Sequence, residues 1–288
     1  MPYWRHCSRM LVICLLWLAI QGFVSQVAAL DLRENLPYGT HPAQVLDLCR
    51  PEAGAMPRPR TGNVVLVHGG GWTGGDKAPL TPLCKTLAEK GHTVISVNYR
   101  LADGSAAHAW PAQRDDVLAA LRWMKAQGYM VGAPAKVCFV GFSAGGHISA
   151  KIGEVDPATL AIAGGVTFSC IVDNFGPIDL VAETADKLRP AICRLVAAPE
   201  AETCRERAAA LSRMAITRTY PRTLVIQGKT DQLVPPSQSE NFAKALQNAG
   251  VNTRLILYDG GHSYERAAPE TVRGLWQAQY DFIADAFQ

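Results

Sequence analysis

The stretch VCFVGFSAGGH, residues Val137 to His147, decides which fold this sequence adopts. Its first four residues form a short apolar run, which is typical of a strand buried in a sheet. The glycines that follow, at Gly141, Gly145 and Gly146, permit a bend too tight for bulkier residues. Two interpretations are open here: a structural strand-to-helix turn, or a turn that presents Ser143 to solvent as a nucleophile. A G-x-S-x-G match also occurs by chance, so the rest of the chain must decide.

The chain outside this stretch alternates short apolar runs with longer helical patterns. Short continuous runs of this kind fit strands that are covered on both faces, and they predict strands at 63–67, 93–98, 137–140, 166–172, 223–227 and 253–258. The intervening patterns predict helices at about 80–90, 114–127, 237–249 and 270–287. This order predicts an α/β fold with a doubly wound, mostly parallel sheet. Residues 178–221 are polar and alanine-rich, and we expect them to form a small helical insertion.

Composition and charge restrict the class of protein. The chain has 288 residues, of which 48% are hydrophobic and 18% charged, enough for one large α/β domain over residues 30–288. The formal net charge is +3, which is too small to indicate a nucleic-acid partner.

The first 29 residues differ in kind from the rest. Arg5 and Arg9 lie in a polar head without acidic residues, and a ten-residue apolar run, 11–20, follows. Small residues end the segment at Ala29, so the pattern predicts a secretory signal peptide over 1–29 and a secreted or periplasmic mature protein. An uncleaved membrane anchor is the alternative, although ten apolar residues are too few to span a bilayer core of about 30 Å. No stable membrane span is expected in the mature protein.

Export would place the cysteines in an oxidising compartment. Two of the eight lie in the predicted signal peptide, and the six that remain are Cys49, Cys84, Cys138, Cys170, Cys193 and Cys204. We favour a Cys193–Cys204 disulfide, because these residues are close in sequence around a proline-containing loop. Cys138 and Cys170 lie in apolar strand-like runs, where buried free thiols are an alternative. The chain has no C-x-x-C motif, and no metal or cofactor is expected.

Chemically useful residues follow four of the predicted strands. HGGGW, residues 68–72, follows the first, and the serine turn follows the third. Asp231 and His262 come after the last two strands. The carboxyl ends of parallel strands meet at one edge of a sheet, so a serine, an acid and a histidine would converge there. Taken singly, each residue could have a purely structural role, with Asp231 as a turn residue and His262 in a surface loop. Their joint order and placement favour a catalytic site.

These motifs together resemble the α/β-hydrolase fold. More narrowly, HGGGW, Tyr99-Arg100-Leu101, GFSAGG, Asp231 and His262 resemble esterases and lipases related to hormone-sensitive lipase, including secreted carbohydrate esterases that act on acetyl or feruloyl groups. The resemblance covers about residues 45–288, and the segment Phe175–Leu180 shares it. Two departures stand out: the large N-terminal cap of some relatives is expected to be absent, and His147 replaces the asparagine of many relatives and has no assigned role.

The resemblance implies a Ser-His-Asp triad that passes through an acyl-enzyme. His262 would take the proton of Ser143 as it attacks an ester carbonyl, and Asp231 would orient His262. The backbone N–H groups of Gly70, Gly71 and Ala144 would form the oxyanion hole.

Several other residues compete for roles at this site. Asp173, Asp179 and Asp259 are weaker candidates for the acid because of their positions along the chain. Ser263 and Glu265 are interpreted as surface loop residues. Trp72 is a candidate for lining a substrate pocket, with core packing as the alternative.

The favoured function is a secreted carboxylic-ester hydrolase whose substrate is a small-molecule or polysaccharide-linked ester. An amide hydrolase of the same fold, arylformamidase-like or peptidase-like, would use the same triad and remains an alternative. A non-catalytic binding protein on this scaffold is disfavoured, since binding requires neither the triad nor the glycine-rich loop. No oligomeric state is predicted.

Overall fold

The computed structural model describes residues 29–52, 62–154, 166–182 and 187–288. The predicted signal peptide therefore lies outside the described residues, apart from Ala29. The strands are β1 (Leu30–Pro37), β2 (Val45–Pro51), β3 (Asn63–Val67), β4 (Thr93–Val97), β5 (Ala135–Phe142), β6 (Val166–Asn174), β7 (Arg222–Gly228) and β8 (Thr253–Tyr258). The α-helices are α2 (Thr81–Glu89), α3 (Ala112–Ala126), α4 (Ala144–Ile152), α5 (Arg189–Leu195), α6 (Ala201–Ser212), α7 (Pro236–Asn248) and α8 (Pro269–Ala286).

The eight strands form one sheet in the order β1-β2-β4-β3-β5-β6-β7-β8. All pairings from β4 to β8 are parallel, whereas β1 and β2 pair antiparallel at one edge. The prediction of a mostly parallel α/β sheet is thus confirmed, and each of the six predicted strands is present. The antiparallel edge pair was not predicted, because its residues mix charged and apolar side chains (LDLRENLP in β1).

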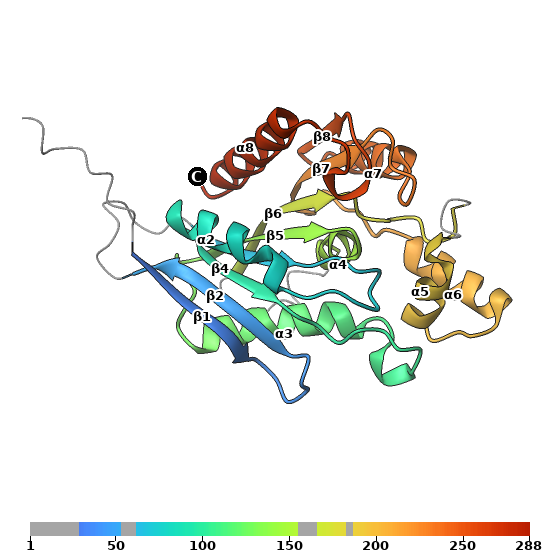
Figure 1. Ribbon diagram of the computed structural model, residues 1–288, viewed down its shortest axis with the longest axis horizontal. Helices are drawn as coiled ribbons and strands as arrows, with labels where there is room; N and C mark the ends of the chain where they lie inside the picture. The colour runs from blue at the N-terminus through green and yellow to red at the C-terminus, as the bar shows by residue number, and fades with distance from the viewer. Residues whose placement is uncertain (1–28, 53–61, 155–165, 183–186) are drawn as a thin grey trace, which may run out of the picture.

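Helices cover both faces of the sheet, as Figure 1 shows. Alternate residues of β3 separate accordingly: Val65 and Val67 pack with α3 and α4, whereas Val64 and Leu66 pack with α2 and α8. This period of two explains why continuous apolar runs mark the buried strands.

The helical insertion expected at 178–221 contains α5 and α6, which lie side by side at one end of the molecule (Figure 1). Cys193 of α5 and Cys204 of α6 form the predicted disulfide. Two further disulfides join Cys49 to Cys84 and Cys138 to Cys170. The alternative of free thiols at Cys138 and Cys170 is therefore wrong: β5 and β6 are neighbours, and the two residues are paired in register.

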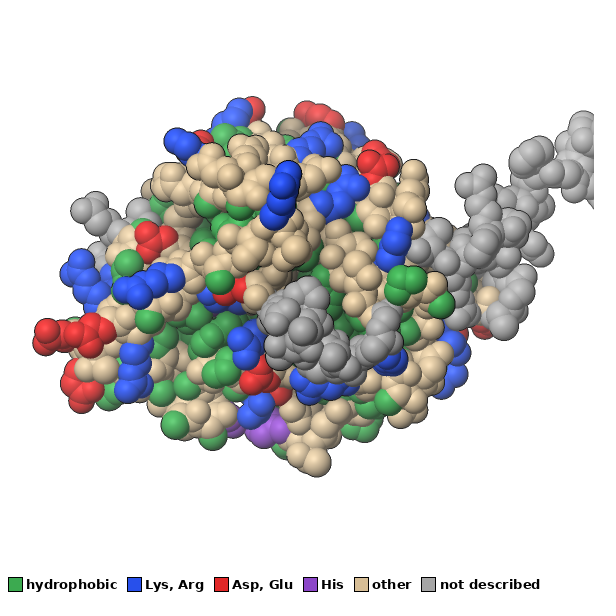
Figure 2. All heavy atoms as spheres, turned by 180° about the vertical axis from the view of Figure 1, so that it is seen from behind, with side chains coloured by type: hydrophobic (Ala, Val, Ile, Leu, Met, Phe, Trp, Pro, Cys, Tyr) green, Lys and Arg blue, Asp and Glu red, His purple; other side chains and the backbone are tan. Residues whose placement is uncertain are grey.

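Charged side chains of both signs are interspersed over the face shown in Figure 2. That pattern agrees with the small net charge of the chain. Among the helices in the described part of the chain, none has the length and hydropathy needed to cross a membrane.

Candidate active site

The turn between β5 and α4 places Ser143 at the carboxyl edge of the sheet. Ser143 has φ 52° and ψ −119°, a conformation that a non-glycine residue rarely adopts. Its backbone N–H donates to the carbonyl of Asn174 at 2.8 Å, which ties the turn to β6. Steric constraints explain why the motif has glycine at two positions. A Cβ on Gly141 would collide with the carbonyl of Gly145, and one on Gly145 would collide with the carbonyl of Val67.

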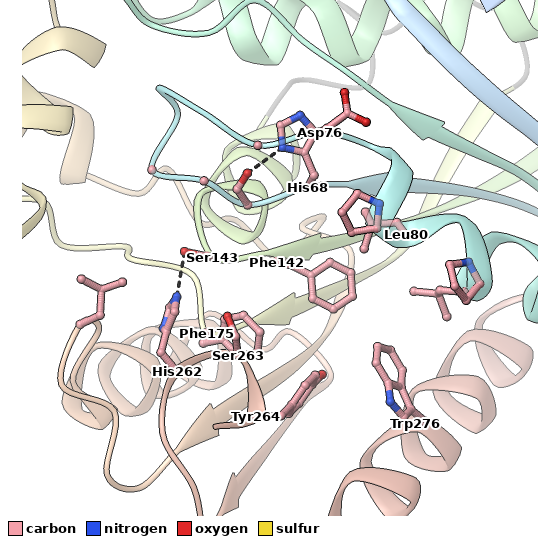
Figure 3. A pocket seen from close by; sticks show the side chains of 18 of the residues that line it. His68, Asp76, Leu80, Phe142, Ser143, Phe175, His262, Ser263, Tyr264 and Trp276 are labelled. Atoms are coloured by element: carbon pink, nitrogen blue, oxygen red, sulfur yellow. Dashed lines mark hydrogen bonds between the residues drawn. The ribbon is translucent and has the colours of Figure 1, made fainter. Parts of the chain in front are cut away.

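The structure brings Ser143, His262 and Asp231 together from three different strand ends. Nε2 of His262 lies 3.0 Å from Oγ of Ser143 (Figure 3). Nδ1 of His262 lies 2.7 Å from Oδ2 of Asp231. Asp231 is 3% exposed and Ser143 is 9% exposed, so the hydrogen bonds are largely shielded from water. In this arrangement His262 can take a proton from Ser143 while its other nitrogen donates to Asp231.

Asp231 is held as a carboxylate by several donors. Oδ1 accepts the backbone N–H groups of Leu233 and Val234 at 2.8 and 2.9 Å, and Oδ2 accepts Nε2 of Gln227 at 2.9 Å. Burial alone would raise the pKa of Asp231, but the hydrogen bonds from His262 and these backbone groups outweigh it and lower the pKa below its ordinary value.

Gln227 is a neighbour of the site that the sequence analysis missed. Its amide donates to Asp231 and to the carbonyl of Val234, and its oxygen accepts the hydroxyl of Ser239 at 2.9 Å. Gln227 thereby fixes the Asp231 loop to α7. The only sequence feature that could indicate this role is the position of Gln227, four residues before the candidate acid and at the end of an apolar strand.

The competing acids make other contacts. Asp173 accepts the N–H of Gly176, Asp179 accepts the N–H groups of Val181 and Ala182, and Asp259 pairs with Lys229 at 2.8 Å. None of these interactions leads to His262.

The glycine-rich loop after β3 faces the serine. Gly70 and Gly71 have φ values of +117° and +58°, and a Cβ on Gly70 would collide with the carbonyl of Gly74. The start of the loop is fixed by His68, whose ring stacks on Tyr99 at 4.3 Å and whose Nδ1 donates to the carbonyl of Gly69 at 2.6 Å. Burial lowers the pKa of His68, so it is neutral at physiological pH.

Two of the three candidate oxyanion donors line the cavity, and the third follows Ser143 directly in the chain. Gly70 and Gly71 line it beside Ser143, and Ala144 is the first residue of α4, where helix N–H groups have no partner within the helix. Within the described ranges, no backbone or side-chain acceptor is bonded to the N–H groups of Gly70, Gly71 or Ala144. Donors that are placed and unpaired are what a developing negative oxygen requires.

The prediction that Trp72 lines the substrate pocket is wrong, and the packing alternative holds. Trp72 is 0% exposed, and its ring meets the edge of His147 at 5.4 Å. Trp110 contacts the other side of His147 at 5.3 Å. Trp72 has φ +60° and is not among the residues that line the cavity. Burial lowers the pKa of His147 to about 3, so its ring is a neutral part of this aromatic core.

The cavity at the site has a volume of about 930 Å³. Ser143, His262 and the glycine loop occupy one part of it, and Ser263 also lines it, beside His262. In the described part of the chain, no cluster of three His, Cys, Asp or Glu residues is placed to hold a metal ion.

Comparison with known proteins agrees with this geometry. The profile of the BD-FAE family matches residues 46–246, which is most of the chain. The chain belongs to the BD-FAE family. The esterase LipC of Mycobacterium tuberculosis is 30% identical over 81% of this chain and 60% of its own length. A probable isoprenylcysteine alpha-carbonyl methylesterase of Oryza sativa subsp. japonica is 27% identical over 91% of this chain and 64% of its own length. The chain thus spans about 60% of the length of these curated relatives.

Solved structures share the fold. A truncated carbohydrate esterase from gut microbiota has a TM-score of 0.74 with 22% identity, covering 93% of this chain and 99% of its own. A bacterial heroin esterase has a TM-score of 0.69 with 21% identity, covering 98% of this chain and 91% of its own. The chain therefore has the α/β-hydrolase fold expected from its motifs.

Proposed function

We propose that this protein is an exported carboxylic-ester hydrolase that acts through Ser143, His262 and Asp231. The observation that carries the proposal is the bridge made by His262, 3.0 Å from the Ser143 hydroxyl and 2.7 Å from the Asp231 carboxylate, at the wall of a large cavity. The esterase names of the relatives support it, and so does the carbohydrate esterase among the structural neighbours.

The reaction proceeds in two halves. Oγ of Ser143 attacks the ester carbonyl carbon while His262 takes the hydroxyl proton, and the carbonyl oxygen becomes an oxyanion held by the N–H groups of Gly70, Gly71 and Ala144. The oxyanion collapses, the bond to the alcohol oxygen breaks, and His262 returns the proton to that oxygen. Water then attacks the acyl-Ser143 ester by the same steps and releases the acid.

Export is proposed from the tripartite pattern of residues 1–29 and from the three disulfides, which persist in oxidising compartments. The substrate would then be an ester met outside the cytoplasm, either a small molecule or an acyl group carried by a polysaccharide.

The test is labelling with a fluorophosphonate, read by intact mass. The mature chain is expected to gain one adduct, and Ser143→Ala is expected to gain none. Ser263→Ala is the matched control, because Ser263 lines the same cavity beside His262 and is expected to leave the adduct unchanged. Absence of an adduct on the folded wild-type protein, or an adduct retained in Ser143→Ala, would contradict the proposal.

A further inference from the structure

The catalytic cavity continues well beyond Ser143 into a side arm. One wall of the arm comes from the start of α2 and the turn before it, with Leu80 and Leu83. The opposite wall comes from α8, with Trp276 and Tyr280. Phe142, the residue before the nucleophile, forms the junction between the arm and the site (Figure 3).

Aromatic rings line the arm without a break. Starting at His262, successive ring centroids along Phe175, Tyr264, Trp276 and Tyr280 lie 4.9, 5.3, 5.5 and 6.5 Å apart. Apart from Phe175, these side chains are partly exposed rather than sealed in the core. A row of apolar surface that starts at the catalytic histidine and stays open to the cavity is suited to an apolar group of the substrate.

The arm offers little to a charged group. Asp76 is the only carboxylate among the described residues that line the cavity. Its oxygens already accept the amide of Asn98 and the N–H of Ala78, both at 2.7 Å. The tyrosine at position 264 is likewise engaged, because its hydroxyl donates to Asn174 at 2.7 Å. An apolar occupant therefore leaves the Asp76 carboxylate and the Tyr264 hydroxyl with the partners they already have.

The chemistry of the triad indicates which half of the ester enters the arm. His262 must reach the alcohol oxygen with Nε2 to return the proton, so the alcohol leaves on the side of His262. The acyl group must point elsewhere. Figure 3 shows Phe142, Leu80 and Trp276 to one side of the Ser143–His262 pair.

We propose that the arm between α2 and α8 is an acyl pocket that selects esters of medium-chain apolar acids over acetates. This proposal rests on the proposed ester hydrolysis at Ser143. Each methylene that the arm removes from water favours the longer acyl group by up to about fourfold in kcat/KM.

The test compares p-nitrophenyl acetate with p-nitrophenyl octanoate below their critical micelle concentrations, with active sites counted by fluorophosphonate. The wild type is expected to prefer the octanoate at least tenfold in kcat/KM. Leu83→Gln, which places an amide in the apolar wall, is expected to lower that ratio about tenfold. Lys85→Gln is the matched control: it lies on the same helix, is exposed and does not line the cavity, so its ratio should equal that of the wild type.

Trp276→Ala is the second variant, since it removes a wall without adding a polar group. It is expected to lower the octanoate-to-acetate ratio as well, because the acyl chain loses its contact with the indole. A wild-type preference for acetate, or ratios that stay unchanged in both arm variants, would overturn the acyl pocket while leaving ester hydrolysis intact. Failure of the fluorophosphonate to label wild type would instead overturn the proposed function.

A second series separates the two halves of the ester. Ethyl acetate and octyl acetate vary the alcohol while the acyl group stays constant. Leu83→Gln is expected to change the ratio of their kcat/KM values by less than about twofold. A side chain that the alcohol does not touch stabilises both transition states equally. If Leu83→Gln penalised octyl acetate and spared p-nitrophenyl octanoate, the arm would bind the alcohol and the proposal would be wrong.

Discussion

At the scale of single residues, Asp173 is a buried carboxyl group that the proposed mechanism does not use. It lies at the end of β6, is 0% exposed, and accepts the N–H of Gly176 at 3.0 Å through Oδ1. Oδ2 has no hydrogen-bond partner among the described residues. Burial raises the pKa of Asp173 to about 7, so the group is neutral in mildly acidic solution and carries an unpaired charge above neutral pH.

Asp173 should therefore make stability fall as pH rises. Its folded-state pKa lies above the unfolded value, so its neutral form is favoured in the folded state, and this advantage is lost between about pH 4 and pH 7. Asp173→Asn keeps the oxygen that accepts Gly176 but cannot ionise. We expect the variant to gain stability over wild type at pH 8, by at most about 4 kcal/mol, and to gain less than half of that amount at pH 5. Urea unfolding at both pH values measures this, and an equal difference at pH 5 and pH 8 would refute it.

Residue identity at the site was predictable where it follows from chemistry. Ser143, Asp231 and His262 could be named because few residue types can form a nucleophile, an orienting acid and a base. Trp72 was misplaced because an aromatic residue beside a glycine loop can line a pocket or pack in the core, and only the tertiary structure shows that it is fully buried in the core. Gln227 was missed because nothing local distinguishes a glutamine that holds a carboxylate from one that faces water.

At the scale of elements, the short helices α5 and α6 depend on a covalent link. They meet through the disulfide between Cys193 and Cys204, 11 residues apart in sequence, and Cys204 is buried in the main core. Besides the bridge, α5 and α6 contribute Ile192, Leu195, Ala208 and Leu211 to the core.

Replacing both cysteines of this bridge by serine should destabilise the protein while sparing catalysis of a small ester. Closing a loop of this length contributes about 3 kcal/mol in the chain-entropy description, and neither residue lines the catalytic cavity. The measurement is urea unfolding without reductant, together with kcat/KM for p-nitrophenyl acetate. Unchanged stability would mean that the bridge contributes nothing to folding, and lost acetate hydrolysis would mean that α5 and α6 shape the site directly.

At the scale of the whole molecule, proposed export and the three disulfides together predict that the exported protein has no free thiol. The chain after Ala29, which is the proposed mature protein, contains six cysteines, and the three disulfides use all of them. The remaining two, Cys7 and Cys14, lie in the predicted signal peptide.

Maleimide labelling under denaturing, non-reducing conditions should therefore add no mass to the protein recovered from an exporting host. After reduction, six adducts are expected. Eight adducts after reduction would show that Cys7 and Cys14 are retained and that the leader is not cleaved. Any adduct before reduction on a cleaved chain would contradict the complete disulfide set.

The sequence by itself determined the class of fold, the six central strands and the residues of the candidate triad. Those features are set by local patterns: apolar runs for strands buried on both faces, glycines where a turn needs them, and side chains whose chemistry is rare. Tertiary structure alone decided the edge pair β1–β2, the disulfides of Cys49 and Cys138, the burial of Trp72 and the arm of the cavity between α2 and α8. Each of these depends on which segments meet in space, because a wall built from α2 and α8 joins residues almost 200 positions apart, and no local pattern encodes that distance.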